Sequence, residues 1–295
     1  MLNPQYWILL ASMFVPMGAL LSIVWVSNWR RSLGKERPPV SEKLLRPAGE
    51  SLRQKLEKLD EQINETLLWI FLGPALVTAI LLIQSPAPQL SKSYGAVGIL
   101  LTAALAAFVF LLRKLLRLIN VRRDFRLGFA GERAVAEELN QLMLDGCRVF
   151  HDVPMEPYGN IDHVVLAATG IYAVETKARR KRPAPAGQRD HEVVFDGKLL
   201  NFPHCSDSKA LAQAKQQADR LRVFLSKAIG EPVKVGAILT FPGWLVSSRV
   251  RSEIKVLNPK NIRSAVQDNR LPTLPKQLLD RVAHQLDQRC RDVEF

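Results

Sequence analysis

Three long apolar stretches lie in the first 112 residues, and they constrain the fold of this chain more than any other feature of its sequence. They run over residues 7–26, 66–83 and 96–112, and none contains an ionisable side chain. A helix of about 20 apolar residues crosses a hydrocarbon core of about 30 Å. We therefore predict three transmembrane helices, the second with a kink at Pro74.

Two of these stretches have an alternative interpretation. The first could be a secretory signal peptide, but the preceding residues MLNPQY contain no basic side chain, which favours an uncleaved anchor. The third is the shortest and could be a buried helix of a globular domain. Because no span carries a charge near the membrane centre, we interpret the spans as an anchor rather than a transport pathway.

Basic residues are distributed unequally around the spans. None precedes the first span, nine lie between the first and second, only Lys92 lies between the second and third, and six lie within 113–126. Since cytoplasmic loops are enriched in Lys and Arg, we predict an external N-terminus and a cytoplasmic C-terminal domain. The predicted location is the cell (inner) membrane, as a multi-pass protein with lipid around its spans.

The sequence predicts four parts along the chain. Residues 1–112 form the anchor, in which the charged segment 50–65 is a cytoplasmic helix with leucines at helical spacing. Residues 113–124 form a basic juxtamembrane linker. An α/β domain covers 125–245, and a C-terminal strand and helices over 246–295 complete or flank it.

Within the α/β part, apolar periodicity and turn residues predict the individual elements. We expect helices over 127–145, 208–228, 259–268 and 274–290. We expect strands over 148–153, 160–166, 171–177, 233–241 and 252–257, and a hairpin that turns at Asp196-Gly197.

Charge and cysteine content limit the classes of function. Residues 113–295 carry 31 basic against 21 acidic side chains, which favours an anionic partner, either nucleic acid or lipid. Part of this charge is the run Arg179, Arg180, Lys181 and Arg182, which either contacts a nucleic-acid backbone or is a solvated loop. The three cysteines are scattered and the histidines are dispersed, so neither a zinc cluster nor a histidine-based site is favoured. A homo-oligomer is left open.

The most informative polar residues are Asp162, Glu175 and Lys177. If residues 167–170 form a hairpin turn, Leu166 faces Ile171 and Asp162 lies opposite Glu175 on the same sheet face. Lys177, two residues further, shares that face. Paired carboxylates suit a hard cation such as Mg²⁺, and a neighbouring ammonium could act on a bound water or on developing phosphate charge.

This pattern is weak when taken alone. Glu253-Ile-Lys255 is a second Glu-x-Lys sequence, although no acidic residue lies in the preceding run from Val233 to Ser252. From spacing alone, the three residues could equally be a solvated strand face with an ordinary ion pair.

Three segments considered together show a resemblance to a known family. GFAGERAVAEEL, NIDHVVLAATGIYAVETKA and ALAQAKQQADRL follow one another within residues 125–245. In this order they resemble the NERD, or nuclease-related, domain, which belongs to the PD-(D/E)xK nuclease-like superfamily. The resemblance implies a restriction-endonuclease-like mixed β-sheet flanked by helices, and a site that cleaves phosphodiester bonds with magnesium or manganese.

The resemblance also assigns roles to individual residues. It implies that Glu132, Asp162 and Glu175 bind the metal ion and that Lys177 acts on the attacking water. It implies that Gln213 helps to position substrate, although Gln216 or Gln217 could take its place.

Two functions follow as expectations. The first is a membrane-tethered, metal-dependent nuclease that acts on DNA or RNA at the cytoplasmic face. The second is a non-catalytic scaffold that binds nucleic acid or recruits a protein. The complete Asp…Glu-x-Lys set favours the enzyme, because acids that face a polyanion cost affinity unless a cation offsets them.

Overall fold

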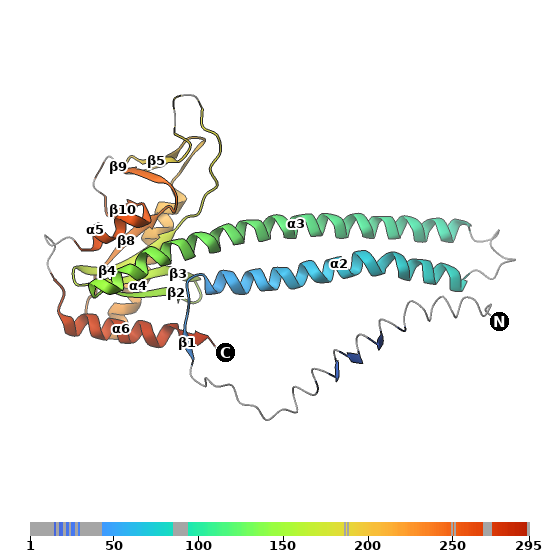
Figure 1. Cartoon of the computed structure of the whole chain (residues 1–295), viewed down its shortest axis with the longest axis horizontal. Helices are drawn as coiled ribbons and strands as arrows, with labels where there is room; N and C mark the ends of the chain where they lie inside the picture. The colour runs from blue at the N-terminus through green and yellow to red at the C-terminus, as the bar shows by residue number, and fades with distance from the viewer. Residues whose placement is uncertain are drawn as a thin grey trace. The chain divides into compact units, whose positions relative to one another are not determined.

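The computed structural model describes residues 43–84, 94–185, 187, 189–248, 250, 252–267 and 273–293, and a few positions between 15 and 29. The chain divides into two compact units. One comprises Met1–Ser41 and Lys58–Arg122, and the other comprises Glu42–Glu57 and Arg123–Phe295. Two long helices, α2 (Glu50–Gln84) and α3 (Tyr94–Asn140), contribute residues to both units (Figure 1).

One helical stretch among the described residues, Gly98–Asp145, is long and apolar enough to cross a membrane, judged by length and composition. It contains residues 98–112 of the third predicted span, which covers 96–112. The second predicted span lies within α2, with Pro74 inside the helix. The first, over 7–26, lies outside the described residues apart from isolated positions. Three spans therefore remain a prediction, and one candidate spanning helix is observed.

Both long helices continue where the sequence analysis placed a boundary. The charged helix 50–65 and the span 66–83 are parts of α2, and the linker 113–124 is an interior part of α3. Neither 50–72 nor 99–127 contains Gly or Pro, and both are rich in Leu, Lys and Arg, so nothing in the local sequence ends the helix. The helix predicted over 127–145 ends at Asn140 and is followed by a 3₁₀ turn, η2 (Gln141–Asp145).

A five-stranded mixed sheet forms the centre of the second unit, in the order β10-β8-β4-β3-β2. Strands β2, β3 and β4 are antiparallel, whereas β8 is parallel to both β4 and β10. The strands cover the ranges β2 (Arg148–Pro154), β3 (Asn160–Ala167), β4 (Gly170–Thr176), β8 (Val235–Thr240) and β10 (Ile254–Leu257). These are the five strands that the sequence predicted.

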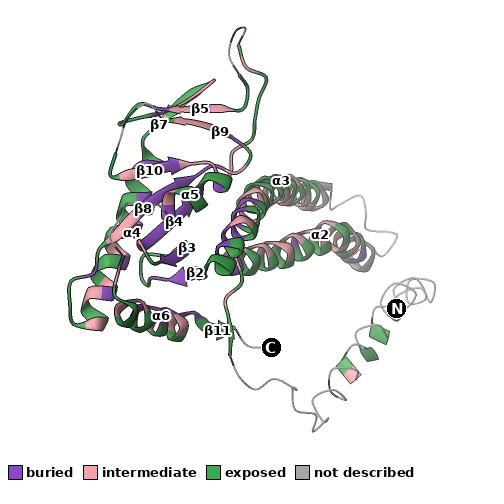
Figure 2. Ribbon diagram, turned by 60° about the vertical axis from the view of Figure 1, so that its left-hand side comes forward, coloured by how far each residue is buried: buried purple, intermediate pink, exposed green. Residues whose placement is uncertain are grey.

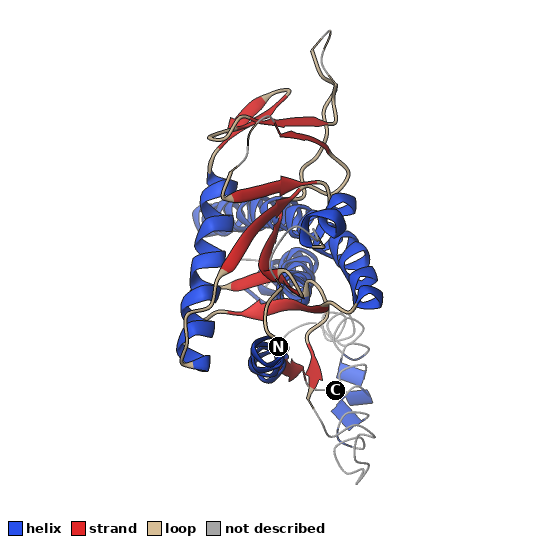
Figure 3. Ribbon diagram, turned by 90° about the vertical axis from the view of Figure 1, so that its left-hand side faces the viewer, coloured by secondary structure: helices blue, strands red, loops and turns tan. Residues whose placement is uncertain are grey.

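Helices cover both faces of this sheet (Figure 3). On one face, α4 (Lys209–Ile229) and α6 (Lys276–Cys290) pack against alternate strand residues such as Val164 and Ile171. On the other face, α3, η2 and α5 (Ile262–Val266) pack against the intervening residues such as Val165 and Val174. Two-residue alternation thus gives each strand two apolar faces, and buried residues gather on β3, β4 and β8 (Figure 2). The mixed α/β prediction is confirmed.

A second sheet has the order β7-β6-β5-β9. The predicted hairpin is its centre: β5 (Glu192–Phe195) and β6 (Leu200–Phe202) are antiparallel, and Gly197 in their turn has a φ of 102°. The other strands are β7 (Cys205–Asp207) and β9 (Leu245–Ser248). The sequence analysis missed β9, a four-residue strand whose residues pair with residues of β5 that lie 53 positions earlier in the chain.

Residues 43–57, which we call the strap, belong to the second unit although they precede two predicted spans. Within the strap, β1 (Leu44–Leu45) pairs antiparallel with β11 (Arg291–Val293), and α2 begins at Glu50. The sequence analysis had placed this segment in the anchor, since short elements that pair with the far end of a chain leave no local pattern.

Candidate carboxylate site

The register of β3 and β4 brings the predicted site residues together. Leu166 pairs with Ile171 and His163 with Val174, and the same register continued by one residue puts Asp162 opposite Glu175, as the sequence predicted. The Asp162 carboxylate accepts a hydrogen bond from the Thr176 backbone N–H at 2.7 Å, which ties the two strand ends together.

Glu175 is the most buried acid of this group, with 1% of its surface exposed. Its Oε1 lies 2.5 Å from Nζ of Lys177, whereas its buried Oε2 has no hydrogen-bond partner. Burial raises the pKa of Glu175, and the Lys177 ammonium opposes this rise. A buried oxygen without a hydrogen-bond partner costs free energy of folding, so Oε2 of Glu175 destabilises the fold in this state.

The pKa of Asp162 is raised as well. Its pKa is raised well above the ordinary value, first by desolvation and then by the charges of Glu175 and Glu132. The Thr176 N–H and Lys177 pull this pKa downward but do not compensate. Like charges held close together in a desolvated site disfavour full ionisation of the group.

Glu132 reaches the same cluster from α3. Its helix can approach the end of β4 because residue 131 is glycine: a Cβ at Gly131 would lie 2.6 Å from Cβ of Ala178. Burial, Asp152 and Glu175 raise the pKa of Glu132 to about 8, while Lys177 and Lys55 oppose the shift. The predicted trio Glu132, Asp162 and Glu175 therefore forms one interacting group.

Asp152 is a fourth acid that the sequence analysis missed. The pairs His151↔His163 and Val153↔Ile161 on either side of it place it beside Asp162 across β2 and β3. Its φ of 48° is unusual for a residue other than glycine. An acid between apolar residues of a predicted strand was the signal that could have identified it.

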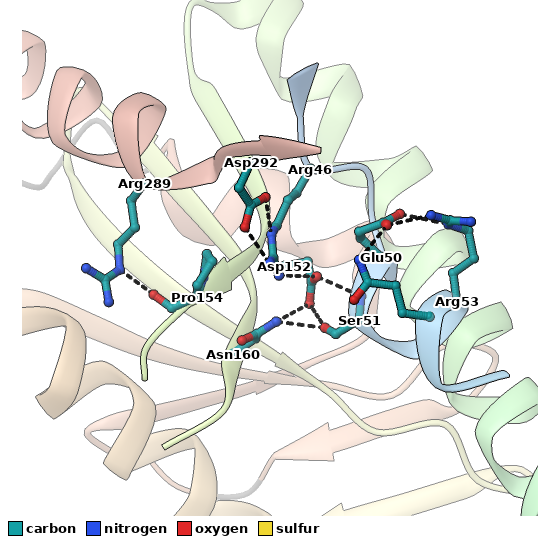
Figure 4. Close-up of polar contacts among 10 residues, drawn as sticks. Arg46, Glu50, Ser51, Arg53, Asp152, Pro154, Asn160, Arg289 and Asp292 are labelled. Carbon is teal, nitrogen blue, oxygen red and sulfur yellow. Dashed lines mark hydrogen bonds and ion pairs between the residues drawn. The ribbon is translucent and has the colours of Figure 1, made fainter. Parts of the chain in front are cut away.

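The strap satisfies the Asp152 carboxylate (Figure 4). Asp152 accepts hydrogen bonds from the Ser51 backbone N–H at 2.8 Å, from the Ser51 hydroxyl, and from Nδ2 of Asn160 at 3.0 Å. Nη1 of Arg46 lies 3.1 Å from it, and the same guanidinium pairs with Asp292. Asp152 is 2% exposed, and its carboxylate links the strap to β2 and β3 through these contacts.

Gln217, rather than Gln213, lies beside the carboxylates. Gln213 is exposed on α4, whereas Gln217 is buried and its amide lowers the pKa of Glu175. Nε2 of Gln217 donates to the Asn160 carbonyl at 3.3 Å, and its Oε1 has no partner. The four-residue difference is one helical turn, which the sequence cannot fix without knowing how α4 packs on the sheet.

The basic run follows the end of β4, next to Lys177. Arg179, Arg180 and Arg182 line one pocket with Phe202 and Trp244. Lys181 is exposed and is not part of that lining. Contact with nucleic acid remains a prediction for all four residues.

Two histidines expected to be dispersed are in contact. Nδ1 of His151 lies 2.9 Å from Nδ1 of His163, and Nε2 of His151 lies 2.9 Å from the Asn140 side-chain oxygen. Burial lowers the pKa of both rings, so a neutral pair is favoured. His163 alternates with Asp162 along β3 and therefore faces the other side of the sheet.

The donor set of the carboxylate cluster fits a hard divalent cation in its chemistry. It consists of carboxylate oxygens, one of them buried without a partner, and their mutual repulsion would be relieved by a cation. Within the described part of the chain, however, no three His, Cys, Asp or Glu side chains converge as a ready-formed metal centre.

Comparison with known proteins gives one match. No curated protein and no solved structure matches the chain. Residues 127–242 match the family model NERD, described as the nuclease-related domain. This range includes Glu132, Asp162, Glu175 and Lys177, and it overlaps most of the domain predicted over 125–245. The chain therefore carries a nuclease-related domain at residues 127–242, which indicates a nuclease-like fold.

Proposed function

We propose that this chain is a membrane-tethered, metal-dependent nuclease that hydrolyses phosphodiester bonds of DNA or RNA at the cytoplasmic face. The observation that carries this proposal is the buried, unpartnered Oε2 of Glu175 within a group of mutually repelling acids. A purely structural cluster would be expected to satisfy such an atom, as the strap does for Asp152.

Glu132, Asp162 and Glu175 would hold the cation, magnesium or manganese. When bound, such an ion polarises a phosphoryl oxygen and lowers the pKa of a bound water. Lys177 would stabilise negative charge that develops on the phosphate, since its ammonium is held by Glu175 and its side chain is still 29% exposed. Gln217, with an unpaired amide oxygen, would orient substrate or water at the same place.

A specific observation also favours the second candidate, a non-catalytic scaffold. Lys177 and Glu175 already form a short ion pair, and the described acids do not converge on one point. A domain that kept the fold and lost catalysis could retain this pair for stability alone.

One experiment separates the two candidates. The full chain in detergent micelles, with magnesium or manganese, would be tested for nicking of plasmid DNA and cleavage of labelled RNA. We expect Asp162→Asn and Glu175→Gln to reduce cleavage by at least about 100-fold, because each removes a charge that holds the cation. The matched control is Glu253→Gln, which alters the second Glu-x-Lys sequence at an exposed residue paired with Lys215.

Two results would contradict the nuclease proposal in favour of the scaffold. In the first, the wild type cleaves nucleic acid no faster than Asp162→Asn does. In the second, magnesium does not raise the melting temperature of the wild type.

The proposed topology has three spans, an external N-terminus and a cytoplasmic domain. The unequal distribution of basic residues supports it, as do the exposed apolar side chains of α2 and α3, such as Trp69, Phe71, Leu105 and Phe110. A reporter inserted near Ser91 should be external and one fused after Phe295 should be cytoplasmic. An exported C-terminal reporter would contradict the topology.

A further inference from the structure

A pocket of about 480 Å³ lies beside the carboxylate site. Ala178, the residue after Lys177, lines it, and so do Asp124 and Leu127 of α3, eight and five residues before Glu132. The pocket and the carboxylates therefore share the end of β4 and one helix, so that a ligand in the pocket would lie close to the proposed reaction.

Arg179 forms a flat cationic surface in this pocket. Its guanidinium lies over the Phe202 ring, 4.3 Å from the ring centroid, and its edge pairs with Asp207. The backbone oxygen of Arg179 accepts a hydrogen bond from Nε1 of Trp244 at 3.3 Å, which fixes its backbone. Phe202 covers one guanidinium face, and the Arg179 side chain lines the pocket and is still 31% exposed, which leaves room for a ligand to contact it.

The other two arginines supply charge for a phosphate. Arg180 pairs with Asp124 at 2.9 Å, but the Asp124 side chain is 71% exposed, and exposed ion pairs contribute little free energy. A phosphate could therefore replace Asp124 as the partner of Arg180. Arg182 has no ion-pair partner among the described residues, so a second cation is available.

We infer that this pocket binds one unpaired nucleotide of a single-stranded nucleic acid, with the base stacked on Arg179 and the phosphate near Arg180 and Arg182. Bases of single strands stack on aromatic rings and guanidinium planes, whereas a base within a duplex is paired and stacked and cannot enter a pocket. This inference rests on the proposed function, because it takes nucleic acid as the substrate. It adds that the bound nucleic acid is single-stranded.

The test measures binding without turnover. The full chain in detergent, with EDTA, is titrated into fluorescent single strands of DNA and of RNA, a blunt duplex, and an all-abasic strand of equal length and charge. We expect the wild type to prefer the base-bearing single strands over the abasic strand by about tenfold, since stacking of one base is worth about 1–3 kcal/mol. Comparison of the DNA and RNA strands reports the preferred sugar.

Arg179→Lys keeps the charge but removes the planar group, so it should abolish the preference for bases while leaving affinity for the abasic strand nearly unchanged. The matched control is Arg220→Lys, because Arg220 lies over the Tyr158 ring at 4.5 Å outside this pocket. It should retain the full preference. Melting temperatures of both variants show whether either change merely unfolds the domain, and Phe202→Leu, which keeps apolar packing, provides a second test of the stack.

The outcomes separate this inference from the proposed function. The pocket assignment alone would be overturned if the wild type cleaves nucleic acid but binds base-bearing and abasic strands equally. Equal binding of single strand and duplex by a cleaving wild type would have the same meaning. A preference for bases that depends on Arg179, without cleavage, would support the pocket and overturn the nuclease proposal.

Discussion

Two regions at the same end of the central sheet hold buried acids, and they treat them differently. Around Asp152, the strap and Asn160 supply N–H, O–H and guanidinium donors, so the carboxylate is fully partnered. Around Glu175, one lysine pairs with one oxygen and the other oxygen has none. Both acids are almost completely buried, so burial alone does not distinguish them. The number of donors does, and on this basis we propose that Asp152 is a structural acid and that Glu175 binds a ligand.

The largest expected effect is the pH dependence that Glu132 contributes to stability. Its folded-state pKa of about 8 lies above the ordinary 4.5, so the folded protein retains a proton that the unfolded chain releases. The contribution of Glu132 to stability should therefore be full below about pH 4.5 and decrease by several kcal/mol as pH rises from about 4.5 to about 8, at about 1.4 kcal/mol per pKa unit. Urea unfolding in EDTA at several pH values would show a smaller slope for Glu132→Gln than for the wild type. Equal slopes would show that Glu132 is not protonated in the folded state.

Replacement by asparagine should have opposite effects on stability at Asp152 and at its neighbour Asp162. Asp152→Asn weakens charged hydrogen bonds with the strap and should reduce the free energy of unfolding by about 1.5–3 kcal/mol. Asp162→Asn keeps an acceptor for the Thr176 N–H and removes a repelled charge, so stability in EDTA should stay equal or increase. Denaturation of both variants at pH 7.5 tests this comparison. An equal loss in both would mean that Asp162 is also a structural acid.

A smaller effect is expected at Ser51. Its hydroxyl donates to Asp152 and accepts from Asn160, so Ser51→Ala should cost about 1 kcal/mol by removing two contacts and keeping the backbone N–H. Ser248→Ala is the control, since the Ser248 hydroxyl bonds a nearby carbonyl at an exposed position. Similar melting temperatures for both variants would show that the strap contributes little through this hydroxyl.

Local pattern predicted the hairpin that carries the site, because strand alternation and a short turn determine register together. Leu166 pairs with Ile171 as expected, and this pairing places Asp162 and Glu175 without any knowledge of the rest of the fold. The same kind of reasoning did not decide among Gln213, Gln216 and Gln217, of which Gln217 is the buried one. Which turn of α4 faces Glu175 depends on how the helix packs on the sheet, and that packing is determined by residues distant in sequence.

Asp152 and the strap show a second limit. Arg46 and Asp152 are 106 residues apart, and the segment between them includes two predicted spans. No periodicity or motif in residues 43–57 indicates that they complete a domain that begins at residue 123. The continuous helices α2 and α3 were missed for a related reason: changes in composition at residues 65 and 113 resemble boundaries, although the backbone has no reason to stop there.

The pairing of Arg46 with Asp292 has a consequence for biosynthesis. These residues are 246 positions apart, so Arg46 is synthesised long before its partner. Until residue 292 has emerged, Arg46 lacks its bidentate partner and β1 lacks β11. The strap can therefore be completed only after all five strands of the central sheet have been synthesised. A shortened chain that starts after residue 57 would permanently lack the Arg46 and Ser51 donors to the buried Asp152 carboxylate.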